Sequence, residues 1–250
     1  MSKVFISGSI SIKALPPCVR ESIIKIISQN MEILVGDAAG IDTIVQNFCK
    51  SQGYYNVTVY SIYPEPRYIV DGFKSNFVLP RTESKKERER QAEKDKAMTL
   101  DSGFSLIIWD GKSKGSYQNT LRAIESQKKI KLYLEYEGSF LGQEKINKLE
   151  LEFIFRKNNG YTAAEVVDYL TSEGEEFFKN TREFNKCLIE NKIIKKEDDI
   201  YKPMPGYEHL FFIEKYRGKD KGIKFKNEFI NWIEKWIKEI KPPEQSELIF

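Results

Sequence analysis

Residues 33–42 read Ile33-Leu34-Val35-Gly36-Asp37-Ala38-Ala39-Gly40-Ile41-Asp42, and this stretch decides the fold. Three apolar residues run into a turn of small residues, after which apolar side chains recur at helical spacing up to Gln52. A short apolar run, a glycine-bearing turn and then a helix are typical of an α/β protein. Because the first N–H groups of such a helix face the turn, the segment predicts a place where a ligand, and an anion above all, can bind.

The same pattern occurs twice more. Residues 4–7 lead into Gly8 and Ser9, and residues 106–109 lead into the turn 110–116. This third turn carries Gly111, Lys112, Ser113, Gly115 and Ser116. Its hydroxyl and N–H groups can bind phosphate oxygens, and Lys112 or Lys114 can neutralise their charge. It is not a P-loop, because the GxxxxGK[ST] order is absent.

The first half of the chain alternates between strands and helices. We predict strands at 4–7, 32–35, 57–60, 104–109 and 131–136, with helices between them. This order predicts a Rossmann-like, doubly wound, mostly parallel five-stranded sheet over residues 1–138. The carboxyl ends of parallel strands share one edge of the sheet, so the three turns should converge on a pocket for a phosphate-bearing small molecule. The stretch 61–80 is a long loop, either a ligand cover that includes Arg67 or a packed surface excursion.

The second half has a different pattern, which predicts a smaller winged-helix-like α+β domain over residues 144–241. Thr162 and Glu165 form a capping box, and a helix is expected at 180–190. A small hairpin at 193–195 and 200–202, a strand at 210–215 and an amphipathic helix at 227–240 follow. The face of this last helix that carries Trp232 and Trp236 suits either a core or the seam of a homodimer. Residues 242–250 are expected to be a frayed tail.

Composition excludes several classes of protein. The net charge of +3 is small for 250 residues, so a global polycation is excluded. Three scattered cysteines without CxxC spacing argue against a disulfide framework and a zinc site. The chain opens without a basic-then-apolar leader and has no apolar run of the roughly 20 residues that a membrane span needs. We therefore expect a cytoplasmic protein that has no membrane, metal or cofactor partner.

The segment 36–42 is the sharpest candidate site. Gly36 and Gly40 allow a tight turn and a close approach to a ligand, while Ala38 keeps the mouth open. Asp42 falls in the first turn of the helix. It either caps that turn or accepts a hydrogen bond from a ribose hydroxyl or a base edge.

These motifs, with Lys94-Asp95-Lys96-Ala97-Met98 between them, resemble the SLOG superfamily over about residues 2–135. The most similar group is the YspA-like Rossmannoid proteins, which are related to the nucleotide-binding core of DprA and to the LOG phosphoribohydrolases. The resemblance implies a sheet that binds nucleotides, nucleotide-sugars or nucleic-acid ends. The residues that it implies as ligand-binding are Gly8, Ser9, Gly36, Ala38, Gly40, Asp42, Asp95, Ser113, Gly115 and Ser116.

The chain departs from the family at points that bear on catalysis. Lys94 stands where an arginine is often found, and Ser116 stands where threonine is usual. The LOG enzymes use a glutamate shortly after this position, and residues 115–119 contain no carboxylate. Cleavage of a glycosidic bond needs a positioned carboxyl group or its equivalent. The lone histidine, His209, lies in the other domain and offers no triad. Whether the protein is an enzyme stays open, and no catalytic residue is assigned.

The second domain has a fainter resemblance to the C-terminal KilA-type domain of phage antirepressors, carried by residues 162–170, 183–194, 201–207 and 211–213. That resemblance implies a DNA or protein partner. The helix 180–190 would then face the groove, with Lys179, Arg182 and Lys186 on phosphates. The glutamates of the same region oppose DNA binding.

The leading hypothesis is a nucleotide binder or sensor with a C-terminal interaction module, in a phage or anti-phage setting. The alternatives are an N-glycosidic-bond hydrolase or transferase, and a DprA-like protein that binds single-stranded DNA.

Overall fold

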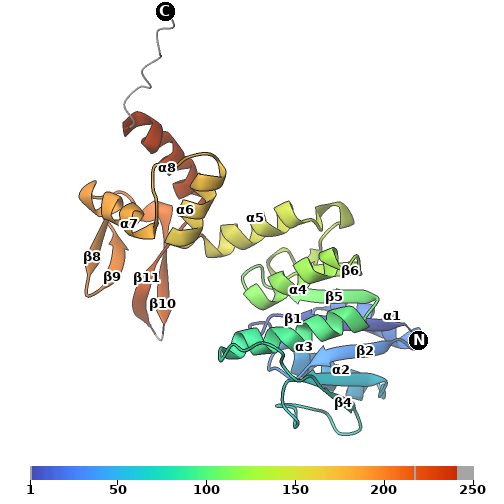
Figure 1. The fold of residues 1–250 in the computed structure, drawn as a ribbon. Coiled ribbons are helices and arrows are strands. Elements are labelled where there is room, and N and C mark those ends of the chain that lie inside the picture. The colour runs from blue at the N-terminus through green and yellow to red at the C-terminus, as the bar shows by residue number, and fades with distance from the viewer. Residues whose placement is uncertain (1, 217, 241–250) are drawn as a thin grey trace, which may run out of the picture. The chain divides into compact units, whose positions relative to one another are not determined.

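The computed structural model describes residues 2–216 and 218–240 (Figure 1). The chain divides into two compact units, Met1–Ile154 and Phe155–Phe250. The tail expected at 242–250 lies outside the described residues.

The first unit contains a seven-stranded sheet in the order β4-β3-β2-β1-β5-β6-β7. Neighbouring strands run parallel except for β7, which is antiparallel to β6. The strands are β1 (Lys3–Gly8), β2 (Glu32–Gly36), β3 (Val57–Ser61), β4 (Lys74–Phe77), β5 (Phe104–Trp109), β6 (Lys129–Leu134) and β7 (Ser139–Phe140). The predicted α/β class and mostly parallel sheet are confirmed, and the arrangement is consistent with a Rossmann-like fold.

The prediction of five strands is wrong, because it missed the two edge strands β4 and β7. β4 escaped notice because its sequence is polar and three of its four residues are exposed, so it carries no apolar pattern. β7 has only two residues, which is too short for a periodicity.

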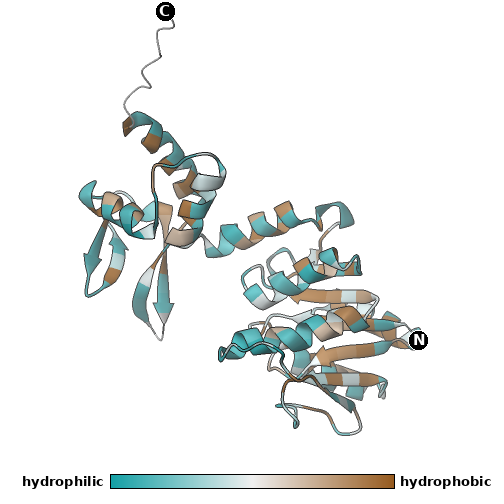
Figure 2. Ribbon diagram, viewed as in Figure 1, coloured by the Kyte–Doolittle hydropathy of each residue, from teal (hydrophilic) through white to brown (hydrophobic). Residues whose placement is uncertain are grey.

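Helices cover both faces of this sheet. They are α1 (Pro17–Ser28), α2 (Ile41–Ser51), α3 (Glu87–Asp101) and α4 (Lys114–Glu125). Successive β1 side chains point to opposite faces, so Val4 and Ile6 join the core cluster that holds α1 and α2, whereas Phe5 packs with Met98 of α3. Figure 2 shows the consequence, with brown strands between helices that turn teal faces outward.

The centre of the sheet is its topological switch point. β1 lies between β2 and β5, and the chain builds outward through β2, β3 and β4 before it returns to the other side of β1. In open α/β sheets, ligands bind outside the carboxyl ends of the strands at such a point.

The first unit extends beyond the interval 139–143 in which the sequence places the domain boundary. The N–H of Leu141 donates to Leu132, and the side chain of Gln143 donates to Ile130. Lys148 pairs with Glu125 of α4. These contacts hold η1 (Glu135–Glu137), β7, η2 (Gln143–Lys145) and the start of α5 (Lys148–Asn159) on the sheet, so the division falls after Ile154.

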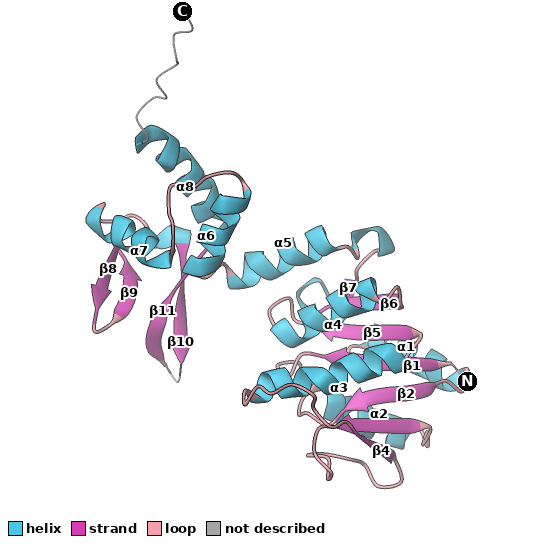
Figure 3. Cartoon of the chain, in the orientation of Figure 1, coloured by secondary structure: helices cyan, strands magenta, loops and turns pink. Residues whose placement is uncertain are grey.

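The second unit is a small α+β assembly (Figure 3). Its elements are α6 (Ala163–Ser172), α7 (Thr181–Glu190), β8 (Ile194–Glu197), β9 (Ile200–Pro203), η3 (Glu208–Leu210), β10 (Phe211–Tyr216), β11 (Lys219–Phe225) and α8 (Asn227–Ile240). β8 pairs with β9, and β10 pairs with β11, both antiparallel. The sequence predicted β10 without its partner, because β11 begins with three charged residues and a glycine and shows no apolar run.

The core of the second unit is aromatic. The rings of Phe184, Phe211, Phe225 and Phe229 are buried and meet in T-shaped or tilted pairs. The Trp232 and Trp236 rings stack on each other and pack against this cluster, as the core alternative predicted. Of the helices described in the chain, none is both long and apolar enough to cross a membrane.

Candidate functional site

A cavity of about 780 Å³ opens at the carboxyl ends of β1 and β5 and continues between α3 and α4. Its volume lies within the range of small-molecule sites. Eight of the residues predicted from the sequence line it: Gly8, Ser9, Ala38, Asp42, Asp95, Ser113, Gly115 and Ser116. The three turns therefore meet at one edge of the sheet, as their positions after parallel strands required.

Four predicted residues do not line the cavity. Gly36 lies beneath the buried charges, where an added Cβ would come within 2.3 Å of Asp42 Oδ2. Gly40 has φ +83° and packs against the backbone of Ile10, with 2.6 Å between an added Cβ and the Ile10 Cα. These glycines shape the wall rather than face a ligand. Gly111, which is buried, and Lys112, which is exposed, precede Ser113 in the same turn and do not line the cavity.

Three hydroxyls converge at the start of α4. Ser9 Oγ lies 2.6 Å from Ser113 Oγ and 3.2 Å from Ser116 Oγ, and the last two are 2.9 Å apart. No side chain caps the first turn of α4, and the space beside Gly115 is open. The first N–H groups of this helix therefore face the cavity together with the hydroxyls, which makes a strong anion-binding arrangement.

Asp110 holds this turn in place. Its Oδ1 accepts hydrogen bonds from the N–H groups of Lys112 and Ser113, at 2.9 and 2.7 Å, and its Oδ2 accepts from Ser11 at 2.6 Å. Burial alone would raise the pKa of Asp110, but these hydrogen bonds outweigh it and keep the pKa below its usual value. Asp110 thus stays charged and fixes the backbone next to the serines.

Buried charges line the inner part of the cavity. Lys94 Nζ is 2.9 Å from Asp95 Oδ1, and Arg122 is 3.6 Å from Asp95 Oδ2. Burial opposes the charge of Lys94, but Asp95 and Asp42 outweigh it, so its pKa lies above the usual value. Burial lowers the pKa of Arg122, and Asp95 compensates only in part. The cavity therefore offers cations that a ligand anion or acceptor can stabilise further.

Among these buried groups, Asp42 is a carboxyl whose negative charge the surroundings stabilise poorly. It is 9% exposed, and its Oδ2 accepts one hydrogen bond, from the Ala38 N–H at 3.2 Å. Burial raises its pKa to about 6, while Lys94 opposes the rise. A carboxyl group that holds its proton close to neutral pH inside a cavity is a candidate acid–base group.

The long loop after β3 is tied to the site by an ion pair. Arg67 binds both oxygens of Asp37, with Nη2 to Oδ1 at 2.6 Å and Nε to Oδ2 at 3.1 Å, and Ser61 donates to the same carboxylate. Burial would raise the pKa of Asp37, but these partners outweigh it and hold the pKa below its usual value. Since Arg67 also lines the cavity, the loop contributes to its wall, and Val70 and Phe73 of the same loop pack into the core.

Other residues that line the cavity could not be recognised as site residues from the sequence. Ser7 lies inside a strand that reads as plain core, and Asn119 and Arg122 lie in the middle of α4 among ordinary helix-surface residues. Arg88 and Gln91 belong to the charged face of α3, which reads as solvated. Only the packing of α3 beside α4 brings these side chains together.

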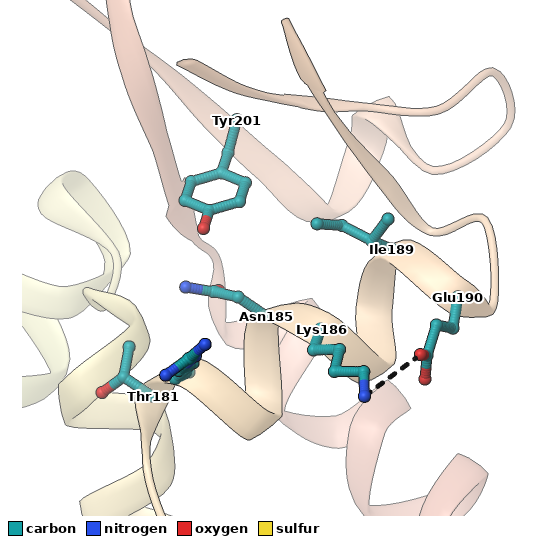
Figure 4. A pocket seen from close by; sticks show the side chains of 7 residues that line it. Thr181, Asn185, Lys186, Ile189, Glu190 and Tyr201 are labelled. Atoms are coloured by element: carbon teal, nitrogen blue, oxygen red, sulfur yellow. Dashed lines mark ion pairs between the residues drawn. The ribbon is translucent and has the colours of Figure 1, made fainter. Parts of the chain in front are cut away.

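The second unit carries a shallower groove of about 600 Å³ on α7 (Figure 4). Thr181, Arg182, Asn185, Lys186, Ile189 and Glu190 line it from the helix, and Tyr201 of β9 closes it. Arg182 and Lys186, two of the three predicted nucleic-acid contacts, are thus side by side with an aromatic ring. Lys179 precedes the helix and does not line the groove.

The positive charge around this groove is largely balanced. Lys186 pairs with Glu190, as the dashed line in Figure 4 marks. On the adjacent hairpin, Lys195 and Lys202 pair with Glu197, and Lys196 pairs with Asp199. The opposing acids expected from the sequence are therefore in contact with the lysines.

Among residues 2–216 and 218–240, no group of three or more His, Cys, Asp or Glu side chains could hold a metal ion. No family model, curated protein or solved structure matches the chain.

Proposed function

We propose that the protein binds a nucleotide or nucleotide-derived ligand in the cavity at the switch point of its parallel sheet. The observation that carries the proposal is the cluster of Ser9, Ser113 and Ser116 hydroxyls at the uncapped start of α4. Helix N–H groups and hydroxyls that converge on one point suit a phosphate group. The remaining volume, lined by Asp42, Asp95 and cationic side chains, suits a ribose and a base.

The resemblance of residues 2–135 to the SLOG superfamily supports the same proposal. The eight implied residues that line the cavity come from four separate segments of the chain. A ligand held by them would touch the turns after β1 and β2, the middle of α3 and the start of α4.

The proposal is tested by melting the full chain with a panel of nucleoside mono-, di- and triphosphates and the matching nucleosides. We expect at least one phosphate-bearing compound to raise Tm, because a ligand that binds only the folded state stabilises it. Ser116→Ala should reduce this shift. Ser102→Ala is the matched control, because Ser102 is equally buried at the far end of α3. If no compound raises Tm, or if both variants lose the shift equally, the proposal is wrong.

Asp42 favours a second candidate function, cleavage of the N-glycosidic bond of the bound nucleotide. Asp42 would donate its proton to the departing base, and the water that adds to C1′ of the ribose would return a proton to Asp42, which yields free base and sugar phosphate. Its pKa of about 6 leaves a usable protonated fraction near neutral pH. Chromatography of nucleotides incubated with the protein tests this, with Asp42→Asn as the inactive variant. If the nucleotide is still intact after long incubation, the cleavage activity is excluded and the proposal of nucleotide binding stands.

We propose that the second unit acts as a winged-helix-like interaction module for DNA or a protein partner. α6, α7 and the β8–β9 hairpin follow one another in the order that such a module requires. The groove on α7 places an aromatic ring beside Arg182 and Lys186, a combination that suits a polyanion with exposed bases or an acidic peptide.

Binding of duplex DNA at several salt concentrations tests the DNA branch. Replacing the three predicted phosphate contacts by Gln, two of which line the groove, should lower affinity and reduce the salt slope by up to about three. The triple variant is Lys179→Gln, Arg182→Gln, Lys186→Gln, and its charge-matched control is Lys195→Gln, Lys196→Gln, Lys202→Gln on the ion-paired hairpin. Equal losses would mean that net charge alone acts, and absence of DNA binding would leave the protein-partner branch.

A further inference from the structure

The inner end of the cavity holds polar donors that nothing satisfies. Within the described residues, three buried side-chain atoms have no hydrogen-bond partner: Ser7 Oγ, Ser105 Oγ and Arg122 Nε. Ser7, only 4% exposed, and Arg122 both line the cavity, whereas Ser105 does not. Buried polar atoms are almost always paired, so two orphans at one cavity wall point to an acceptor that the bound ligand supplies.

Asn119 adds a third donor beside them. Its Oδ1 accepts a hydrogen bond from Arg122 Nη2, which leaves the Nδ2 group to donate elsewhere. Asn119 is 6% exposed and lines the same wall. Because an Arg side chain never accepts a hydrogen bond, this end of the cavity is mainly a set of donors.

The surroundings favour a neutral acceptor over a second phosphate at this end of the cavity. Asp95 lies 3.6 Å from Arg122 and would repel another dianion. Phe5 and Met98 line the same inner region and are almost fully buried. An apolar surface beside a few fixed polar groups suits a planar, neutral ring with polar atoms on its edge.

The distance between the serine cluster and Arg122 suits the length of a nucleotide, with the phosphate at the serines and the base at Arg122. Ser116 and Arg122 are six residues apart on α4, which is about 9 Å along a helix. That length is close to the reach of a mononucleotide from its phosphate to the far edge of its base. A phosphate at the serine cluster therefore carries its base toward Arg122, and Asn119 lies between the two on the same helix.

We propose that the cavity selects a base with a lactam edge, a ring carbonyl beside a ring N–H, as in hypoxanthine and guanine. Ser7, Asn119 and Arg122 donate to the carbonyl oxygen and to the ring nitrogen N7, and Asp95 accepts from the ring N–H at N1. Adenine presents an amino group in place of the carbonyl and a bare nitrogen at N1, so it leaves the donors to the carbonyl unpaired and gives the carboxylate no ring N–H. The inference rests on the proposed function, since it names the base of the same ligand.

Calorimetric titration of the full chain with inosine 5′-monophosphate and adenosine 5′-monophosphate tests the inference. The two nucleotides differ only at the edge in question. We expect inosine monophosphate to bind at least tenfold more tightly, because a site built to hydrogen-bond a group rejects an analogue that lacks it. Ser7→Ala should reduce this ratio at least threefold. It should hold or raise the Tm of the free protein, because it removes an unpaired hydroxyl.

Ser105→Ala is the matched control. Its hydroxyl is also buried and unpaired, but it lies outside the cavity, so its removal should leave the ratio unchanged. Equal affinity for the two nucleotides, or a preference for adenosine monophosphate, overturns the inference while the binding proposal stands. A preference that Ser7→Ala does not alter overturns the assignment of these donors. If no nucleotide of the earlier panel binds, the proposed function itself fails.

Discussion

Replacing Asp42 by Asn should stabilise the protein more at neutral pH than at acidic pH. Burial raises the pKa of Asp42 from 3.8 to about 6, so the folded state keeps a proton that the unfolded chain releases. Such a group weakens the folded state progressively as pH rises through this interval. One pKa unit corresponds to about 1.4 kcal/mol. The advantage of the variant should therefore grow from about 1.5 kcal/mol at pH 5 to about 3 kcal/mol at pH 7.

Burial decides the direction of the pKa shift of Asp42, and the charged groups around it change only its size. Lys94 attracts the carboxylate, while Asp95 and Asp37 repel it, and burial outweighs them all. Asn retains an oxygen that can accept the Ala38 N–H, so the hydrogen bond of 3.2 Å survives the substitution. The change therefore removes the buried charge and little else.

Urea unfolding between pH 5 and 8 measures the effect. Trp109 is the only tryptophan of the first unit, so its fluorescence reports on that unit in a Trp232→Phe, Trp236→Phe background. Asp71→Asn is the control, because it removes one exposed charge elsewhere. A wild-type protein more stable than the variant at pH 7 would refute the reasoning, and so would a difference that does not change with pH.

Two further substitutions test the wall of the cavity. Arg67→Met leaves the carboxylate of Asp37 buried without its ion pair and should cost about 3 kcal/mol at pH 7. Because the paired Asp37 has a lowered pKa, the stability that this ion pair contributes is lost as pH falls. In the same urea assay, the difference in free energy of unfolding between wild type and variant should therefore shrink toward pH 4. A difference that stays constant with pH would contradict the ion-pair account. Gly36→Ala puts a Cβ 2.3 Å from Asp42 Oδ2 and 2.9 Å from Lys94 Nζ, and should cost about 1–3 kcal/mol by thermal melting. Gly103→Ala, where the added Cβ meets nothing within 4 Å, should cost less, and equal costs would show that the two charges move aside freely.

The core of the fold could be predicted because its strands are almost wholly buried. Strands such as Leu106-Ile107-Ile108-Trp109 are short apolar runs that carry their own signal. β4 and β7 carry none, since pairing with a neighbouring strand defines them rather than any apolar pattern. The start of α3 at Glu87 could not be predicted, because the charged residues before it favour no particular helix end.

The site could be predicted only where it depends on local backbone. Gly8, Ser9 and the turn 110–116 follow strands, so their place at one sheet edge follows from the parallel topology. Gly36 was interpreted as ligand-facing because a glycine in such a turn can permit either a ligand or a neighbouring side chain to come close. Its occupant is the pair of Asp42 and Lys94, and the approach of α3, a contact distant in sequence, decides this.

The strain in this unit is concentrated where a ligand would relieve it. Two of the three unpaired buried atoms found in the described residues line the cavity, and so does Asp42, whose charge burial disfavours. A sequence selected for stability alone would have Ala at position 7 and Asn at position 42. The first change removes an unpaired buried hydroxyl, and the second removes a buried charge and keeps the shape of the side chain. Departures from local consistency that gather at one concave site are what a binding function leaves in a fold.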